Sequence, residues 1–373
     1  MLYKQVSSME SVDLFFMKIT STKILAKLTL IGIFSLMYFC VEAREEEVEA
    51  EIGKKVAMQV VELVEKNGLA PKKQSDFLYA KNQLLSNFED SSKFVSKEKI
   101  YSDIQSLLDT TDSDGHSRIL SSIQLNSRFI ATPTASLSDG KFYKIIKTEQ
   151  GDVLSFTLPQ TRDYRLEAQR KYISNVMAEL KKGIAEWRPC AIVLDFTEQK
   201  GGSAAAPLLV LEPFLSENNS AKFVKNRGER LALVDLPTLR KQYTYVAAEF
   251  PNELKRFADG PIAVVSGART ASAGEMLEMA MLGEERRAKS FGWKTAGYTT
   301  ANKNYSLIDG GTLVLSETRY ALGDRPPIIG GIQPLETASS TDSLEMVLER
   351  AASWAAHHSA LCTQNFAADK PKQ

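Results

Sequence analysis

The chain has 373 residues, 43% hydrophobic and 25% charged, which suffices for one large domain or a core with a smaller one. Lysine plus arginine and aspartate plus glutamate number 46 each, and this balance gives no general attraction to nucleic acid or anionic lipid. The sequence has no long basic run or aromatic-basic stripe, so we expect no nucleic-acid partner.

The first 43 residues have the pattern of a secretory signal peptide. Three lysines precede an apolar run of 14 residues, Leu28 to Val41, and Ala43 ends the segment before a cluster of glutamates. A membrane-spanning helix needs about 20 apolar residues. We therefore expect cleavage after Ala43 and a periplasmic or secreted protein. The alternative is an uncleaved anchor, which would be the chain's one contact with a membrane.

Residues 44–118 are expected to form a small N-terminal helical domain. Hydrophobic residues recur at helical spacing from Val48 to Val64, and Phe77–Phe88 and Lys99–Leu108 continue the pattern. The turn-forming residues from Asp109 to Arg118 predict a loop.

Residues 119–362 are expected to form the core, followed by a disordered tail over 363–373. The first expected elements are strands and one long helix: Ser127–Ala131, Phe142–Ile146, Val153–Leu158 and the helix Tyr164–Trp187. Two continuous apolar runs, Cys190–Leu194 and Ile262–Val265, are typical of strands buried on both faces.

The rest of the core continues this alternation. A helix is predicted over Met276–Leu282, β structure over Leu307–Ile329 with a hairpin turn at Asp309-Gly310-Gly311, and a final helix over Leu344–Ala360. Strands that alternate with helices predict an α/β fold with a partly parallel sheet.

Neither the cysteines nor the histidines indicate a cofactor. Only Cys190 and Cys362 remain after cleavage. They could pair in an oxidising compartment. Because Cys190 begins a buried strand, where a thiol behaves as a small apolar side chain, we favour two free thiols. His357 and His358 have no ligand-type residues near them at metal spacing. We predict no metal site and no cofactor.

Ser272 lies between an expected strand and an expected helix. A serine there has an exposed hydroxyl close to the unpaired N–H groups of the first helical turn, which can stabilise an oxyanion. The alternative is a helix cap, with Glu275 completing a capping box. Gly201-Gly202, after the first buried strand, would allow backbone N–H groups to approach a ligand. His116 is a possible general base toward a serine, or a solvent-exposed loop histidine.

Four short segments follow one another in a set order over about 180 residues: Ala191–Asp195 with Gly201-Gly202, Thr270–Glu275, Phe291–Gly297, and Asp309–Gly311 through Pro334. They resemble the motifs I-x-D-L-R-x-N-x-G-G, S-A-S-A-x-E, V-G-x-x-T-x-G and D-G…G-I-x-P-D of the carboxyl-terminal processing (tail-specific) and tricorn-core serine peptidases. Asp114–Ser117 resembles the D-x-H-[ST] motif that precedes the core in that family.

The resemblance implies a crotonase/ClpP-like spiral core of strands and helices. It also implies that Ser272 is the nucleophile of an acyl-enzyme mechanism. The oxyanion hole would be the N–H of Ala273 with that of Gly201 or Gly202.

The sequence departs from the family pattern at the base. Tyr298 stands where many processing peptidases have a lysine, and Lys294 lies on the wrong side of the turn. His116 then takes the base role, as in the tricorn-like branch. Its orienting acceptor is predicted to be Glu317, with Glu275 and Asp114 as rivals. Residues 119–152 are too few for the peptide-binding PDZ domain of many relatives.

The leading hypothesis is an exported serine peptidase that acts on a peptide or protein. The alternative is a catalytically inactive member of the same fold that binds peptides or glycan fragments. It is motivated by Thr197-Glu198-Gln199, which replaces the family's R-x-N. A crotonase-type acyl-thioester enzyme is a third hypothesis, and export argues against it.

Overall fold

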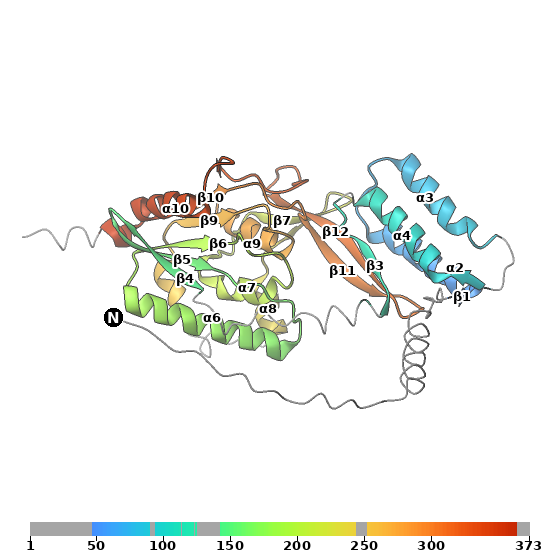
Figure 1. The fold of residues 1–373 in the computed structure, drawn as a ribbon, viewed down its shortest axis with the longest axis horizontal. Coiled ribbons are helices and arrows are strands. Elements are labelled where there is room, and N and C mark those ends of the chain that lie inside the picture. Colours follow the sequence, from blue (N-terminus) through green and yellow to red (C-terminus); the bar gives the residue numbers. More distant parts are fainter. Residues whose placement is uncertain are drawn as a thin grey trace, which may run out of the picture. The chain divides into compact units, whose positions relative to one another are not determined.

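The computed structural model describes residues 47–89, 94–112, 114–122, 124, 142–243 and 252–363. A six-stranded sheet lies at the centre of this part of the chain, with the strand order β13-β10-β9-β6-β5-β4 (Figure 1). Neighbouring strands are parallel, except that β4 runs antiparallel to β5. The strands are β4 (Tyr143–Thr148), β5 (Gly151–Thr157), β6 (Ala191–Asp195), β9 (Ile262–Ser266), β10 (Ala288–Gly292) and β13 (Glu336–Thr337).

Helices cover both faces of this sheet, which explains the uninterrupted apolar sequences of β6 and β9. Val193 of β6 packs toward α10 (Leu344–His358), whereas Ile192 and Leu194 belong to the core on the opposite face. That second core contains α6 (Leu166–Trp187), α7 (Ala205–Val210) and α9 (Ala273–Leu282). The predicted buried strands and the mixed α/β class are confirmed.

A second, smaller sheet has the order β11-β12-β7-β8, and a short strand, β3, also pairs with β12. The predicted turn at Asp309-Gly310-Gly311 joins β11 and β12 as an antiparallel hairpin. The bounds are β3 (Arg118–Leu120), β7 (Ala221–Lys225), β8 (Arg230–Ala232), β11 (Thr300–Ser306) and β12 (Thr312–Leu322), with α8 (Leu236–Gln242) and the 3-10 helices Glu212–Phe214 and Glu253–Phe257 in the connections.

The N-terminal helices pack on this second sheet. Leu313 and Leu315 of β12 and Ile119 of β3 lie in one apolar core with the helices. The three predicted helices are present, and a pair of short strands accompanies them: β1 (Glu47–Glu49), α2 (Ala50–Asn67), α3 (Gln74–Ser86), β2 (Phe94–Ser96) and α4 (Lys97–Thr111). The domain boundary at residue 118 stays a prediction.

One expectation about the core is wrong. Cys190 and Cys362 form a disulfide, with their Cα atoms 4.8 Å apart, because the segment after α10 returns to the start of β6. The predicted signal peptide over 1–43, the predicted strand Ser127–Ala131 and all but the first residue of the predicted tail over 363–373 lie outside the described residues. None of the described helices combines the length and apolar character needed to cross a bilayer.

Candidate active site

Ser272 lies at a sharp turn between strand β9 and helix α9, as predicted. Its backbone has φ 53° and ψ −110°, a combination that a residue with a side chain rarely adopts. Strain of this kind persists only where the surrounding structure enforces it, and it concentrates at functional sites. The capping box of Ser272 with Glu275, which the alternative predicted, is present, and the strained conformation is an additional feature that an ordinary helix cap lacks.

Glu275 holds this turn in place. Its fully buried carboxylate accepts hydrogen bonds from Ser272 N at 2.9 Å, Gly297 N at 2.8 Å and Thr295 Oγ1 at 2.5 Å. Burial raises the pKa of Glu275, and these hydrogen bonds oppose the rise. Because all three donors are structural, Glu275 fixes the backbone of the serine and is not the acceptor for His116.

His116 follows helix α4, and it is buried, with 7% of its surface exposed, instead of extending into solvent. Its Nδ1 lies 2.6 Å from Thr300 Oγ1 on β11, and its ring makes an edge-type contact with the ring of Tyr298, with the two centroids 5.2 Å apart. The pKa of His116 is lowered to about 4, mainly by burial and also by Arg118, while the carboxylates of Asp112 and Asp114 partly oppose the shift. The imidazole is therefore neutral at pH 7, as a general base requires.

A chain of hydroxyl groups connects His116 to a buried carboxylate. Thr300 Oγ1 lies 3.3 Å from Ser316 Oγ, which donates a hydrogen bond of 2.5 Å to Asp112 Oδ2. The same oxygen accepts from Ser117 N at 2.7 Å and Ser117 Oγ at 2.9 Å. Asp112 is thus linked to the imidazole through two hydroxyls.

The glycine pair Gly201-Gly202 lies beside the serine. Both residues have positive φ, 104° and 105°. A Cβ on Gly201 would come within 3.1 Å of Ser272 Cβ, and one on Gly202 within 2.2 Å of Thr161 O. Only glycine fits at both positions. Ala273 begins α9, where a backbone N–H has no partner within the helix.

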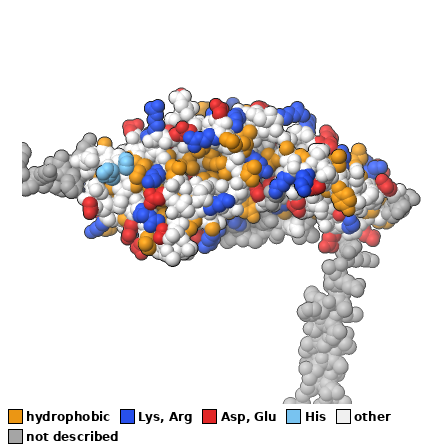
Figure 2. Space-filling model, turned by 90° about the horizontal axis from the view of Figure 1, so that it is seen from above, with side chains coloured by type: hydrophobic (Ala, Val, Ile, Leu, Met, Phe, Trp, Pro, Cys, Tyr) orange, Lys and Arg blue, Asp and Glu red, His pale blue; other side chains and the backbone are white. Residues whose placement is uncertain are grey.

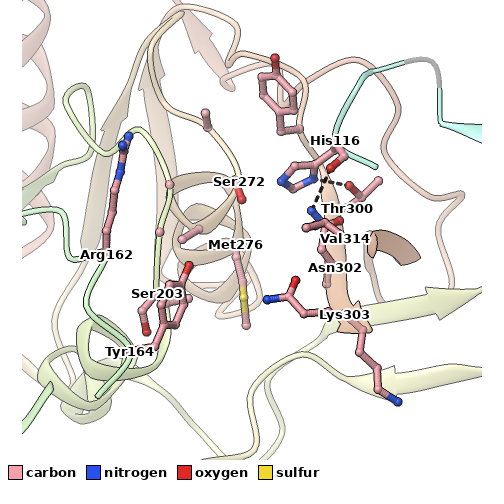
Figure 3. Close-up of a pocket in the computed structure, with 18 of the residues that line it drawn as sticks. His116, Arg162, Tyr164, Ser203, Ser272, Met276, Thr300, Asn302, Lys303 and Val314 are labelled. Atoms are coloured by element: carbon pink, nitrogen blue, oxygen red, sulfur yellow. Dashed lines mark hydrogen bonds between the residues drawn. The ribbon is translucent and has the colours of Figure 1, made fainter. Parts of the chain in front are cut away.

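A cleft of about 920 Å³ brings the predicted residues together. Ser272, His116, Gly201, Gly202 and Ala273 all line it. Figure 3 shows the His116 imidazole on one side of Ser272, with Arg162, Tyr164 and Ser203 on the other. Within the described residues no hydrogen bond joins His116 to Ser272. Such catalytic hydrogen bonds are often long before substrate binds.

The family model for peptidase family S41 matches residues 155–336, the region that contains the β9–α9 turn and the glycine pair. Through this region the chain belongs to peptidase family S41. It is accordingly a serine-type peptidase by class.

Solved structures show the same fold. The chain is similar to a lipoprotein from Streptococcus agalactiae with a TM-score of 0.59 and 20% identity, over 81% of this chain and 96% of that one. It is similar to a photosystem II D1 C-terminal processing protease with a TM-score of 0.50 and 12% identity, over 82% and 98% of the two chains. A comparison with curated proteins gave no match.

The structure does not place either Glu317 or Asp114 in hydrogen-bond contact with His116, the base that they were predicted to orient. Glu317 accepts a hydrogen bond from the hydroxyl of Tyr305, and Asp114 lies 3.6 Å from the guanidinium of Arg319. The strand register around a bulge in the β11–β12 hairpin presents Ser316, not Glu317, toward Thr300. The predicted role of Glu317 is therefore not supported.

Sequence reasoning missed Asp112, Thr300 and Ser316. Asp112 ends helix α4 in a segment rich in turn formers, and nothing in its spacing distinguishes it from its neighbours. Thr300 has a sequence signal that could have identified it, because it follows Tyr298 by two residues, and Tyr298 stands where the family's lysine would be. Lys294 does not line the cleft.

Proposed function

We propose that this S41 member is an exported serine peptidase that hydrolyses peptide bonds through an acyl-enzyme on Ser272, with His116 as general base. The observation that carries the proposal is the cleft itself. It joins a strained serine, a neutral imidazole and two glycines whose backbone approaches the serine. These are the parts that acyl transfer needs: a nucleophile, a base and backbone donors.

The hydrogen-bond chain gives His116 a consistent tautomer. Nδ1–H donates to Thr300 Oγ1, whose own proton points to Ser316 Oγ, and Ser316 donates to Asp112. Nε2 is then left as the acceptor for the hydroxyl proton of Ser272. Asp112 acts on the base as a positioning residue, through two hydroxyls and without contacting the ring.

The reaction follows from these roles. Ser272 Oγ attacks the peptide carbonyl while His116 takes its proton, and the oxyanion is stabilised by the N–H of Ala273 with that of Gly201 or Gly202. The imidazolium gives the proton to the leaving amine, and the acyl-enzyme forms. Water then attacks the ester, His116 accepts one of its protons and returns it to Ser272, and the carboxylic acid leaves.

The finer parts of the proposal have separate support. A spiral core of the crotonase/ClpP type is supported by parallel strands connected through α6 and α9, although the family match is to S41 alone. Export to the periplasm or the exterior is supported by the predicted signal over 1–43 and by the Cys190–Cys362 disulfide, a bond typical of oxidising compartments. The short span over 119–152 supports a peptidase without a PDZ domain.

A fluorophosphonate probe, which modifies activated serines, tests the proposal. We expect the purified wild type to be labelled, Ser272→Ala to lose labelling, and His116→Ala to react roughly 10²- to 10⁴-fold more slowly. Lys294→Ala is the matched control and should label normally, because Lys294 does not line the cleft. A thermal-unfolding scan establishes that each variant is folded.

The inactive peptide-binding alternative is favoured by one observation, the missing hydrogen bond between His116 and Ser272 in the described structure. Folded wild type that resists the probe, and that still binds peptide, would establish it. Export is checked by sequencing the N-terminus of the secreted protein. A mature chain that begins at Met1, or at Met17 if translation starts there, would contradict cleavage after Ala43.

A further inference from the structure

The cleft around Ser272 has a one-sided charge. Among the described residues that line it are four cations, Arg118, Arg162, Lys200 and Lys303, and no aspartate or glutamate. The whole chain is balanced at 46 basic and 46 acidic residues. On the face that Figure 2 shows, basic and acidic side chains are intermixed around hydrophobic ones. The excess of positive charge is thus a property of the cleft and not of the protein.

Arg162 packs against the glycine pair. A Cβ on Gly202 would lie 3.2 Å from Arg162 Cγ, so the stem of the arginine packs directly against the proposed oxyanion loop. Its guanidinium is exposed, and no described carboxylate pairs with it, because the adjacent Asp163 is bound by Arg165. In Figure 3 Arg162 stands on the opposite side of Ser272 from His116.

Arg118 brings a second positive charge to the other side of the cleft. Its Nη1 lies 3.4 Å from His116 O. Burial raises the pKa of Tyr164, and both Arg118 and Arg162 oppose that rise, which places the phenol within the field of both guanidinium groups. Tyr164 itself lines the cleft. The two arginines therefore act on a shared region of the cleft.

The other two cations contribute less. Lys200 lies 3.3 Å from Glu198, which partly neutralises it. Lys303 stands over the ring of Tyr305 at 5.0 Å, and Figure 3 shows its ammonium group directed away from Ser272. Arginine is also the better partner for a carboxylate, because its planar fork donates two parallel hydrogen bonds.

Resting on the proposed peptidase function, we infer that the cleft selects peptides with aspartate or glutamate side chains next to the scissile bond, and that Arg162 determines this specificity. A cleft lined by one sign of charge raises the local concentration of substrates of the opposite sign. Because the stem of Arg162 packs on the proposed oxyanion loop, its exposed guanidinium has the reach to pair with a residue beside the reacting carbonyl.

The binding test uses the Ser272→Ala variant, so that peptide is not consumed. Octapeptides capped at both ends carry Glu, Gln or Lys on each side of the central bond, and their affinities are measured by fluorescence anisotropy. We expect the Glu peptide to bind about three- to tenfold more tightly than its Gln twin, and the Lys peptide to bind least. The difference should shrink in 1 M salt, which screens charge. Equal affinities for Glu and Gln peptides would overturn the inference.

Two comparisons sharpen the test. Arg162→Gln in the same background should remove most of the Glu preference, whereas Lys144→Gln should keep it, since it loses the same charge on β4 without lining the cleft. An undiminished preference in Arg162→Gln would refute the role of Arg162. Peptides with a free C-terminus form the other comparison. If the affinity depends on the free terminal carboxylate and not on the side chains, the cleft binds the C-terminus of the peptide, and the inference is wrong.

Failure of this inference is distinguishable from failure of the peptidase proposal. Probe labelling reports on Ser272 without a charged substrate, and peptide binding needs no turnover. Labelling without a Glu preference refutes the specificity alone. A Glu preference that depends on Arg162 in a protein that resists labelling refutes the peptidase reaction and upholds the selectivity of the cleft.

Discussion

Glu278, one helical turn beyond Glu275 on α9, allows a test of whether a buried carboxyl group close to the serine turn is neutral. Its side chain is fully buried, and Glu278 Oε1 accepts one hydrogen bond, from Ser266 Oγ at 3.1 Å. Glu278 Oε2 has no partner among the described residues. Burial raises the pKa of Glu278 from 4.5 to about 8, and the neighbouring Glu275 adds to the rise. The carboxyl group is therefore neutral at pH 7.

The perturbation is Glu278→Gln, which keeps the shape and cannot ionise. In the wild type, the unfolded chain loses the Glu278 proton above pH 4.5, whereas the folded chain holds it to about pH 8. The stability due to this group is fully present below pH 4.5 and is lost as the pH rises toward 8. With 1.36 kcal/mol for each pKa unit, a rise from 4.5 to about 8 corresponds to a loss of about 5 kcal/mol. The glutamine variant should not show it.

The assay is urea unfolding at pH 5 and pH 8, with the disulfide intact. The variant and the wild type should have similar unfolding free energies at pH 5, and the variant should be several kcal/mol more stable at pH 8. Glu345→Gln, at an exposed position of α10, controls for the lost charge and should follow the wild type. Parallel pH profiles for wild type and Glu278→Gln would refute the reasoning.

Three further predictions concern the site and the core. Because the pKa of His116 is lowered to about 4, probe labelling should persist below pH 6, and an acid limb centred at pH 6.5 or above would contradict this. Gly202→Ala would bring a methyl group against Thr161 O, and it should slow probe labelling at least about 10²-fold. A normal labelling rate would exclude the Gly201-Gly202 backbone from the oxyanion hole. Cys362→Ser, which opens a 172-residue loop to Cys190, should cost about 3–5 kcal/mol in urea unfolding, and an unchanged midpoint would speak against the disulfide.

The parts of the fold that could be predicted are those with a local signal. Ile192 to Leu194 are buried on both faces and apolar without interruption, so β6 is recognisable from the sequence. Asp309-Gly310-Gly311 directly indicates the β11–β12 hairpin. The turn at Ser272 was recognisable because a buried strand and a helix flank it closely.

The parts that could not be predicted depend on long-range register. Whether Ser316 or Glu317 faces Thr300 depends on a bulge in the β11–β12 hairpin, and a shift of one residue reverses the face. The pairing of Cys190 with Cys362 depends on where the chain returns after α10, 172 residues later. His116 is buried because Thr300 and Tyr298 cover it, and its own polar neighbours in sequence suggest exposure.

The contacts around Asp112 also determine when during biogenesis the base is assembled. Asp112 and Ser117 precede their partner Ser316 by 204 and 199 residues. A ribosome or translocon that releases the chain from its N-terminus delivers His116 early and the strand that orients it late. Partly synthesised chains thus lack an oriented base, and the proposed hydrolase stays inert until nearly its whole length has been released.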